Sequence, residues 1–124
     1  MVSLQPPVCD FDLTAIDFNL ADAKGKLHSL EDCRGNKGLL ILFICNHCPY
    51  VKAILPRIVR DTEELKSLGI NSVAIMSNDM SLYEEDSAEN MIKVAEDNNF
   101  SFPYLIDTTQ EVAKAYGAVC TPDF

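Results

Sequence analysis

The sequence predicts a single α/β domain, spanning residues 1–124, in which a mostly parallel sheet is flanked by helices. Two observations predict it. From residue 39 onward, short apolar runs alternate with segments of helical period, in the order strand, helix, strand, helix, strand, helix. The connections between them are short, so right-handed crossovers should place the helices on the faces of the sheet.

Composition excludes several function classes. Nineteen acidic residues face ten basic ones, for a net charge of -9, and Lys and Arg form no stripe. Nucleic acid is therefore not an expected partner. The longest apolar run, residues 38–45, is too short to span a bilayer, and no secretion signal is expected, because residues at the start do not show a basic segment followed by an apolar one. Five cysteines, an odd number without a regular framework, predict reduced thiols in a cytoplasmic setting.

The N-terminal segment, residues 1–37, is rich in turns. Residues 16–20 and 26–30 alternate apolar and polar side chains and predict a β-hairpin. Cys9 and Cys33 fall in this segment without a reactive context, so structural or incidental roles are expected. The turn signals are Pro6-Pro7, Asp22-Ala23-Lys24-Gly25 and Arg34-Gly35-Asn36-Lys37.

A central strand and a long helix follow. Residues 39–44 are continuously apolar, as in a strand buried on both faces. Pro49 suits the first turn of a helix, and an apolar stripe continues to Gly69. Pro56 lies inside this helix and should kink it near Lys52, because it removes a backbone donor. The stripe consists of Val51, Ile54, Leu55, Ile58, Leu65 and Leu68.

The remaining elements complete the alternation. Residues 72–76 and 102–106 predict buried strands, and a helix is expected around residues 88–95. The acidic residues of the stretch 77–87 are expected to be solvated. Thr108 and Glu111 have the spacing of a capping box and predict a short helix that Gly117 ends. We found no internal repeats.

Cys48 is the candidate nucleophile, because it sits where a strand ends and a helix begins. Ligand sites of parallel sheets gather there, and a helix N-terminus favours the thiolate. His47 and Lys52 flank the sulfur and are expected to stabilise its anion further. An equally weighted interpretation makes His47 a partly exposed loop side chain.

Cys45 and Cys48 form a Cys-x-x-Cys motif, which at a strand to helix junction points to redox chemistry. A structural alternative makes Cys45 a buried apolar residue and Cys48 a passive cap. A zinc site of Cys45, His47, Cys48 and Cys120 is a further alternative. No metal is expected, because a second paired motif is missing and the ligands would crowd the end of the sheet.

Two spacings carry a family resemblance. Phe43, Cys48 and Pro56 are spaced like the phenylalanine, nucleophilic cysteine and kinking proline of thioredoxins, although Val51 stands where thioredoxins have their second cysteine. The segment 116–122 has the Tyr-Gly followed by a proline of the same fold. The chain thus resembles a thioredoxin-fold redoxin, of the peroxiredoxin-like branch of the alkyl hydroperoxide reductase and thiol-specific antioxidant superfamily.

The resemblance implies roles for the second segment. Pro122 would be the cis-proline of the fold, and Thr121 a substrate-binding position beside the nucleophile. Cys120 would lie close to Cys48. The family's sheet continues with two more strands and a closing helix, whereas this chain stops at Phe124. An incomplete domain with an unpaired sheet edge is therefore expected, and such edges favour association, for example in a homodimer.

The leading functional hypothesis is a thiol–disulfide oxidoreductase with a role in redox homeostasis. Cys48 attacks a disulfide, and Cys45, Cys120 or an external thiol resolves the intermediate. The expected partners are protein or small-molecule disulfides or peroxides and a cellular thiol reductant, without an organic cofactor.

Two rival functions remain open at this stage. In a peroxidase, Cys48 would form a sulfenic acid, but Cys45 and Ile41 stand where peroxiredoxins have a hydroxyl residue and a proline. The other rival is a binding module that keeps the fold without turnover.

Overall fold

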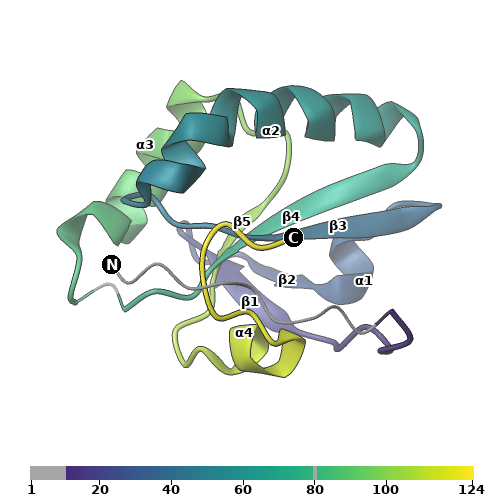
Figure 1. Cartoon of the computed structure of the whole chain (residues 1–124), viewed down its shortest axis with the longest axis horizontal. Coiled ribbons are helices and arrows are strands. Elements are labelled where there is room, and N and C mark those ends of the chain that lie inside the picture. The colour runs from purple at the N-terminus through teal and green to yellow at the C-terminus, as the bar shows by residue number, and fades with distance from the viewer. Residues whose placement is uncertain (1–10, 80) are drawn as a thin grey trace.

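The protein is built around a five-stranded sheet in the order β2-β1-β5-β4-β3 (Figure 1). The structure is a computed structural model that describes residues 11–79 and 81–124, so Pro6-Pro7 and Cys9 lie outside the described residues. β3, β4 and β5 pair in parallel, whereas β1 pairs antiparallel with β2 and β5. The strands are β1 (Asn19–Asp22), β2 (Leu27–Ser29), β3 (Gly38–Phe43), β4 (Ile70–Met76) and β5 (Tyr104–Ile106).

Helices cover both faces of this sheet, as the alternating pattern predicts. α2 and α3 pack on one face, and α1 and α4 on the other (Figure 1). None of the described helices combines the length and the apolar character needed to cross a membrane. The helices are α1 (Leu30–Cys33), α2 (Pro49–Ser67), the short 3-10 turn η1 (Glu84–Asp86), α3 (Ala88–Asp97) and α4 (Glu111–Tyr116).

Strand β4 divides the core into two clusters. Successive side chains of a strand point to opposite faces, so Ala74 and Met76 pack toward α2 and α3. Val73 and Ile75 pack toward α4 and the N-terminal segment. All four are fully buried, which explains why residues 72–76 form a continuous apolar run rather than an alternating one.

The predicted N-terminal hairpin forms, but its first strand lies later than residues 16–20 and its second strand is shorter than residues 26–30. Asp22 fixes the turn, since its carboxylate accepts the backbone N–H groups of Lys24 and Lys26. The second strand ends at Ser29, which caps α1 in a reciprocal box with Asp32. The box places Leu30 in a helix, where the sequence analysis expects a strand.

Helix α2 accommodates Pro56 without ending. The proline lies on the exposed side, and the helix continues to Ser67 before Gly69 adopts a left-handed conformation, with φ of 87°. The first turns run at an angle to the rest of the helix (Figure 1), as the missing backbone donor predicts. This bend brings the start of the helix over the end of β3.

The capping box predicted for α4 is wrong. Gln110 occupies the N-cap position without a capping side chain, and the buried carboxylate of Asp107 accepts the N–H of Ala113 at 2.9 Å. A carboxylate from the end of β5 thus replaces the expected bond between Thr108 and Glu111.

The C-terminal segment returns to the sheet beside β3. The peptide bond between Thr121 and Pro122 is cis. Asp123 then forms an antiparallel bridge with Phe43, with backbone distances of 2.7 and 3.1 Å. This bridge holds the preceding loop against the start of α2.

Candidate active site

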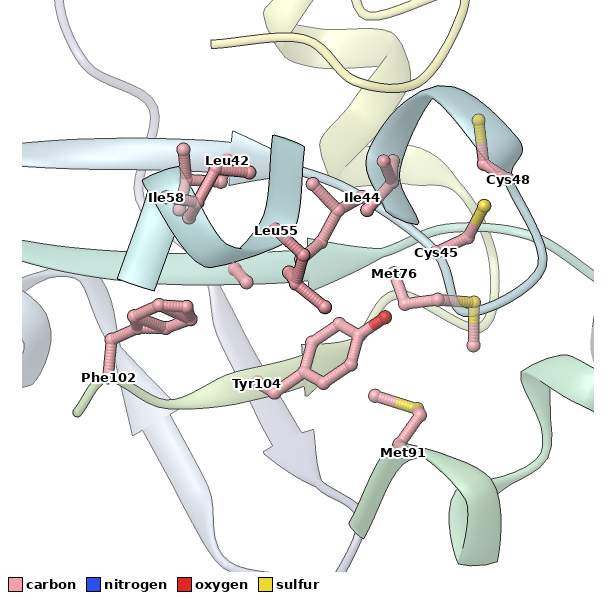
Figure 2. Packing of buried hydrophobic residues seen from close by; sticks show 12 residues of the cluster. Leu42, Ile44, Cys45, Cys48, Leu55, Ile58, Met76, Met91, Phe102 and Tyr104 are labelled. Carbon is pink, nitrogen blue, oxygen red and sulfur yellow. The ribbon is translucent and has the colours of Figure 1, made fainter. Parts of the chain in front are cut away.

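Cys48 is the N-cap residue of α2, and its side chain is fully buried. Pro49 begins the helix, so the thiol belongs to the residue at its N-terminus, and it makes no side-chain capping hydrogen bond there. Its sulfur donates to the backbone carbonyl of Thr121 at 3.6 Å. Figure 2 shows Cys45 and Cys48 together at the end of the apolar cluster below α2. The structure therefore places Cys48 where the sequence pattern predicts.

Cys45 lies beside it, on the loop that leaves β3, and is 2% exposed. Its sulfur contacts the hydroxyl of Thr121 at 3.5 Å and accepts the backbone N–H of Cys48. Burial raises the pKa of the Cys45 thiol, and the negative charge of Asp86 adds to the rise, whereas the two hydrogen bonds oppose it. The two sulfurs of the motif thus share one contact residue, Thr121.

The loop of Cys120, Thr121 and Pro122 converges on this site. Cys120 is partly exposed and lies near enough to Cys48 to feel its charge. Burial raises the pKa of the Cys120 thiol, with further contributions from Asp123 and Cys48. Cys120 and Thr121 also line a cavity of about 350 Å³. All three sequence-predicted cysteines therefore lie in one region.

His47 lies in the loop between β3 and α2 and is partly exposed, as the alternative interpretation has it, but its ring is held by two neighbours. Its side chain is only 12% exposed, and its Nδ1 makes a very short contact with the carboxylate of Asp86. The ring stacks on Tyr83, with centroids 4.2 Å apart. Both neighbours belong to the segment that precedes α3.

Asp86 belongs to the site although no sequence pattern indicates it. The expectation that the acidic residues of the stretch 77–87 are solvated is wrong for this residue, whose exposed fraction is 0%. One of its oxygens accepts the backbone N–H groups of Asn46 at 2.8 Å and His47 at 3.1 Å. The other carboxylate oxygen accepts a hydrogen bond from Asn78 Nδ2 at 3.2 Å and contacts the His47 ring. A single buried carboxylate therefore holds the loop between the two cysteines.

Asn46 ties the same loop to the core. Its Nδ2 donates to the backbone carbonyl of Glu85, and its Oδ1 accepts the hydroxyl of Tyr104, both at 2.9 Å. Burial raises the pKa of Tyr104, which keeps this hydroxyl protonated as a donor. The residues between Cys45 and Cys48 are thus fixed by side chains from distant parts of the chain.

Lys52 has a different partner from the one expected. Its ammonium lies 3.4 Å from Glu85, and the side chain is 58% exposed. Within the described part of the chain, its ion pair is with this carboxylate rather than with the Cys48 sulfur. An exposed pair of this kind contributes little to stability.

One group of potential metal ligands occurs among the described residues. Donor atoms of Cys45, His47 and Asp86 all lie within 4.8 Å of one another. The zinc alternative of the sequence analysis contains the first two, and the structure adds Asp86 in place of Cys48 and Cys120.

Comparison with known proteins agrees with this geometry. Residues 12–123 match the AhpC/TSA family. A thiol-disulfide oxidoreductase ResA from Geobacillus thermodenitrificans is 31% identical over 111 residues, covering 84% of this chain and 55% of the relative. The chain therefore spans about half the length of the curated relatives it matches.

Solved structures share the fold. An uncharacterized conserved protein from Geobacillus kaustophilus is 50% identical, with a TM-score of 0.84 over 88% of this chain and 58% of its own. A hypothetical protein from Sinorhizobium meliloti is 37% identical, with a TM-score of 0.93 over 98% of this chain and 66% of its own. The thioredoxin domain of a thiol-disulfide oxidoreductase from Bacteroides vulgatus is 18% identical, with a TM-score of 0.72 over 93% of this chain and 79% of its own. The fold is thus thioredoxin-like.

Proposed function

Because the chain belongs to the AhpC/TSA family, we propose that it catalyses thiol–disulfide exchange with Cys48 as the nucleophile and Cys45 as the resolving thiol. One observation carries this proposal. The sulfurs of Cys45 and Cys48 both contact Thr121 at the N-terminus of α2. The named oxidoreductase relatives support the same reaction class.

In the first step, the Cys48 thiolate attacks one sulfur of a substrate disulfide. A bond forms between Cys48 and that sulfur, the substrate S–S bond breaks, and the other substrate sulfur leaves as a thiolate. The helix N-terminus supports the negative charge on Cys48 before attack. The proton of the buried thiol is released to solvent.

In the second step, Cys45 resolves the mixed disulfide. Its thiolate attacks Cys48, the second substrate thiol leaves, and a Cys45–Cys48 disulfide remains. Two electrons have then passed to the substrate, and a cellular thiol reductant returns them. The raised pKa of Cys45 makes its deprotonation the demanding part of this step, and the Thr121 hydroxyl and the Cys48 backbone N–H stabilise the resulting anion.

A substrate reaches Cys48 only by replacing a contact of the loop that contains Thr121 and Pro122. Cys48 is fully buried under the Thr121 carbonyl. An extended disulfide-bearing segment that pairs with the backbone of this loop would take over that contact and reach the sulfur. Protein disulfides are therefore the substrate class that we assign to this site.

Turnover of a disulfide substrate tests the function. The chain is mixed with insulin and dithiothreitol, and reduction is followed as turbidity beside the reaction without protein. We expect acceleration by the wild type, its loss in Cys48→Ser, and no change in Cys33→Ser, where the thiol is buried in the other cluster. No acceleration, with rapid formation of a sulfenic acid on Cys48 under peroxide, would overturn the proposal in favour of a peroxidase.

A further inference from the structure

The Cys45, His47 and Asp86 side chains bring three kinds of metal donor together, with Cys45 and Asp86 buried and His47 partly exposed. A thiol sulfur, an imidazole nitrogen and a carboxylate oxygen lie within 4.8 Å of one another. They come from two segments, the loop after β3 and the 3-10 turn η1 (Glu84–Asp86). Such mixed donors are the ones that zinc takes in proteins, whereas calcium and magnesium take oxygen alone.

The distances suit one small ion. Zinc bonds of about 2.3 Å to sulfur and about 2.0–2.2 Å to nitrogen and oxygen place donors roughly 3.3–3.8 Å apart in a tetrahedron. The three donors lie within 4.8 Å of one another, so the side chains meet this requirement by small shifts, in which His47 and Asp86 move apart. His47 and Asp86 are now in direct contact. An ion would take the place of the hydrogen between them, the neutral His47 ring would carry its proton on Nε2, and the thiol proton of Cys45 would leave to solvent.

The surroundings hold these donors in place. Two backbone N–H groups fix the first oxygen of Asp86, and Asn78 supports the second. The His47 ring is stacked on Tyr83. Outer contacts of this kind orient ligands and strengthen metal binding. The donors are therefore positioned by the fold and need little ordering when the ion arrives.

We propose that Cys45, His47 and Asp86 form a zinc-binding site in the reduced protein, with the fourth position open to water or another ligand. From the sequence alone no metal is expected, because a second paired motif is missing. The fold supplies the missing donor from Asp86, which lies 39 residues from His47 along the chain. Binding at this site does not depend on the proposed redox function.

Competition with a chromogenic zinc chelator tests the proposal, with the reduced full chain under anaerobic conditions. We expect one zinc ion per chain, and affinities weakened about tenfold or more in Cys45→Ser, His47→Gln and Asp86→Asn. Cys33→Ser and Cys120→Ser, which remove thiols outside the donor group, should bind as the wild type does. Cobalt in place of zinc should show a sulfur to metal charge-transfer band that Cys45→Ser loses.

Two results would overturn the site. One is the absence of saturable zinc binding by the reduced wild type. The other is unchanged affinity in Cys45→Ser with a loss in Cys120→Ser, since the ion would then sit on other thiols. If Asp86→Asn fails to fold, as judged by circular dichroism, Cys45→Ser decides, because serine is close to cysteine in size and the hydrogen bonds described for this side chain are those with Thr121 and the Cys48 backbone N–H.

Discussion

The carboxylate of Asp86 accepts the backbone N–H of Asn46 at 2.8 Å and so joins η1 to the loop that carries the candidate nucleophile. The same carboxylate bonds the His47 backbone and contacts its ring. The two residues that it contacts here, Asn46 and His47, lie between Cys45 and Cys48 in the sequence. The geometry of the motif therefore depends on a residue outside it.

Replacing Asp86 with Ala should destabilise the protein by about 3 kcal/mol, because several buried donors lose their acceptor together. Urea unfolding measures this change. Asp97→Ala, which removes an exposed carboxylate from α3, is the matched control and should stay near the wild type. Equal effects of the two substitutions would show that the Asp86 contacts contribute nothing.

The difference between Asp86 and its neighbours also shows where sequence reasoning ends. The strand at residues 39–44 and the helix from Pro49 follow from local apolar patterns, and β3 and α2 confirm them. The stretch 77–87 carries several acidic residues that look alike in sequence. Only the packing of η1 against the loop buries one of them, and that is a tertiary contact which no local pattern encodes.

The two capping boxes make the same point. The spacing of Thr108 and Glu111 fits a box, but the N-cap residue of α4 is Gln110, whose backbone is left-handed. The carboxylate of Asp107 accepts a backbone N–H of the helix instead. Ser29 and Asp32 have the same spacing, and there the box forms. Whether a capping box forms depends on the backbone conformation with which the chain leaves the preceding strand. The pairing of that strand in the sheet fixes this conformation.

Thr121→Val should slow the resolving step about fivefold, since one hydrogen bond to Cys45 contributes about 1 kcal/mol. The substitution keeps the shape of the side chain but removes the hydroxyl, which lowers the pKa of the Cys45 thiol. Less Cys45 thiolate is then present at neutral pH. The decay of a mixed disulfide on Cys48, quenched with acid and followed by mass spectrometry, reports the rate.

Thr121→Ser is the control for this measurement, because it retains the hydroxyl, and it should resolve close to the wild-type rate. The same assay should become faster for both proteins as pH rises from 7 to 9, since the fraction of Cys45 thiolate increases about tenfold per pH unit below its pKa. A rate independent of both the hydroxyl and pH would exclude Cys45 as the resolving thiol.

Cys33 should make the protein less stable in alkali. Burial raises the pKa of its thiol to about 11, so the folded state keeps a proton that the unfolded chain releases. Stability is therefore fully present below the unfolded pKa and is lost as pH rises toward 11. Between pH 8 and 11 the wild type should lose about 1–2 kcal/mol more than Cys33→Ala does. Parallel losses in denaturant titrations of the two proteins would refute this linkage.

The free side of β3 should favour association. β3 is an edge strand of the sheet, and in the described structure its outer side carries a single bridge, between Phe43 and Asp123. An apolar cavity of about 360 Å³, lined by residues that include Leu40, Ile54 and Phe124, lies beside it. The mass from light scattering should increase with concentration. A constant monomer mass over the whole concentration range would contradict this prediction.

Disulfide mapping after mild oxidation shows which cysteine pairs with Cys48. The reduced chain is treated with one equivalent of a small disulfide oxidant, its remaining thiols are blocked, and the digested peptides are identified by mass spectrometry. Because Cys45 and Cys48 share Thr121 as a contact, we predict a Cys45–Cys48 link, unchanged in Cys120→Ser. A Cys48–Cys120 link as the main product, lost in Cys120→Ser and retained in Cys45→Ser, would show that Cys45 is not the resolving thiol.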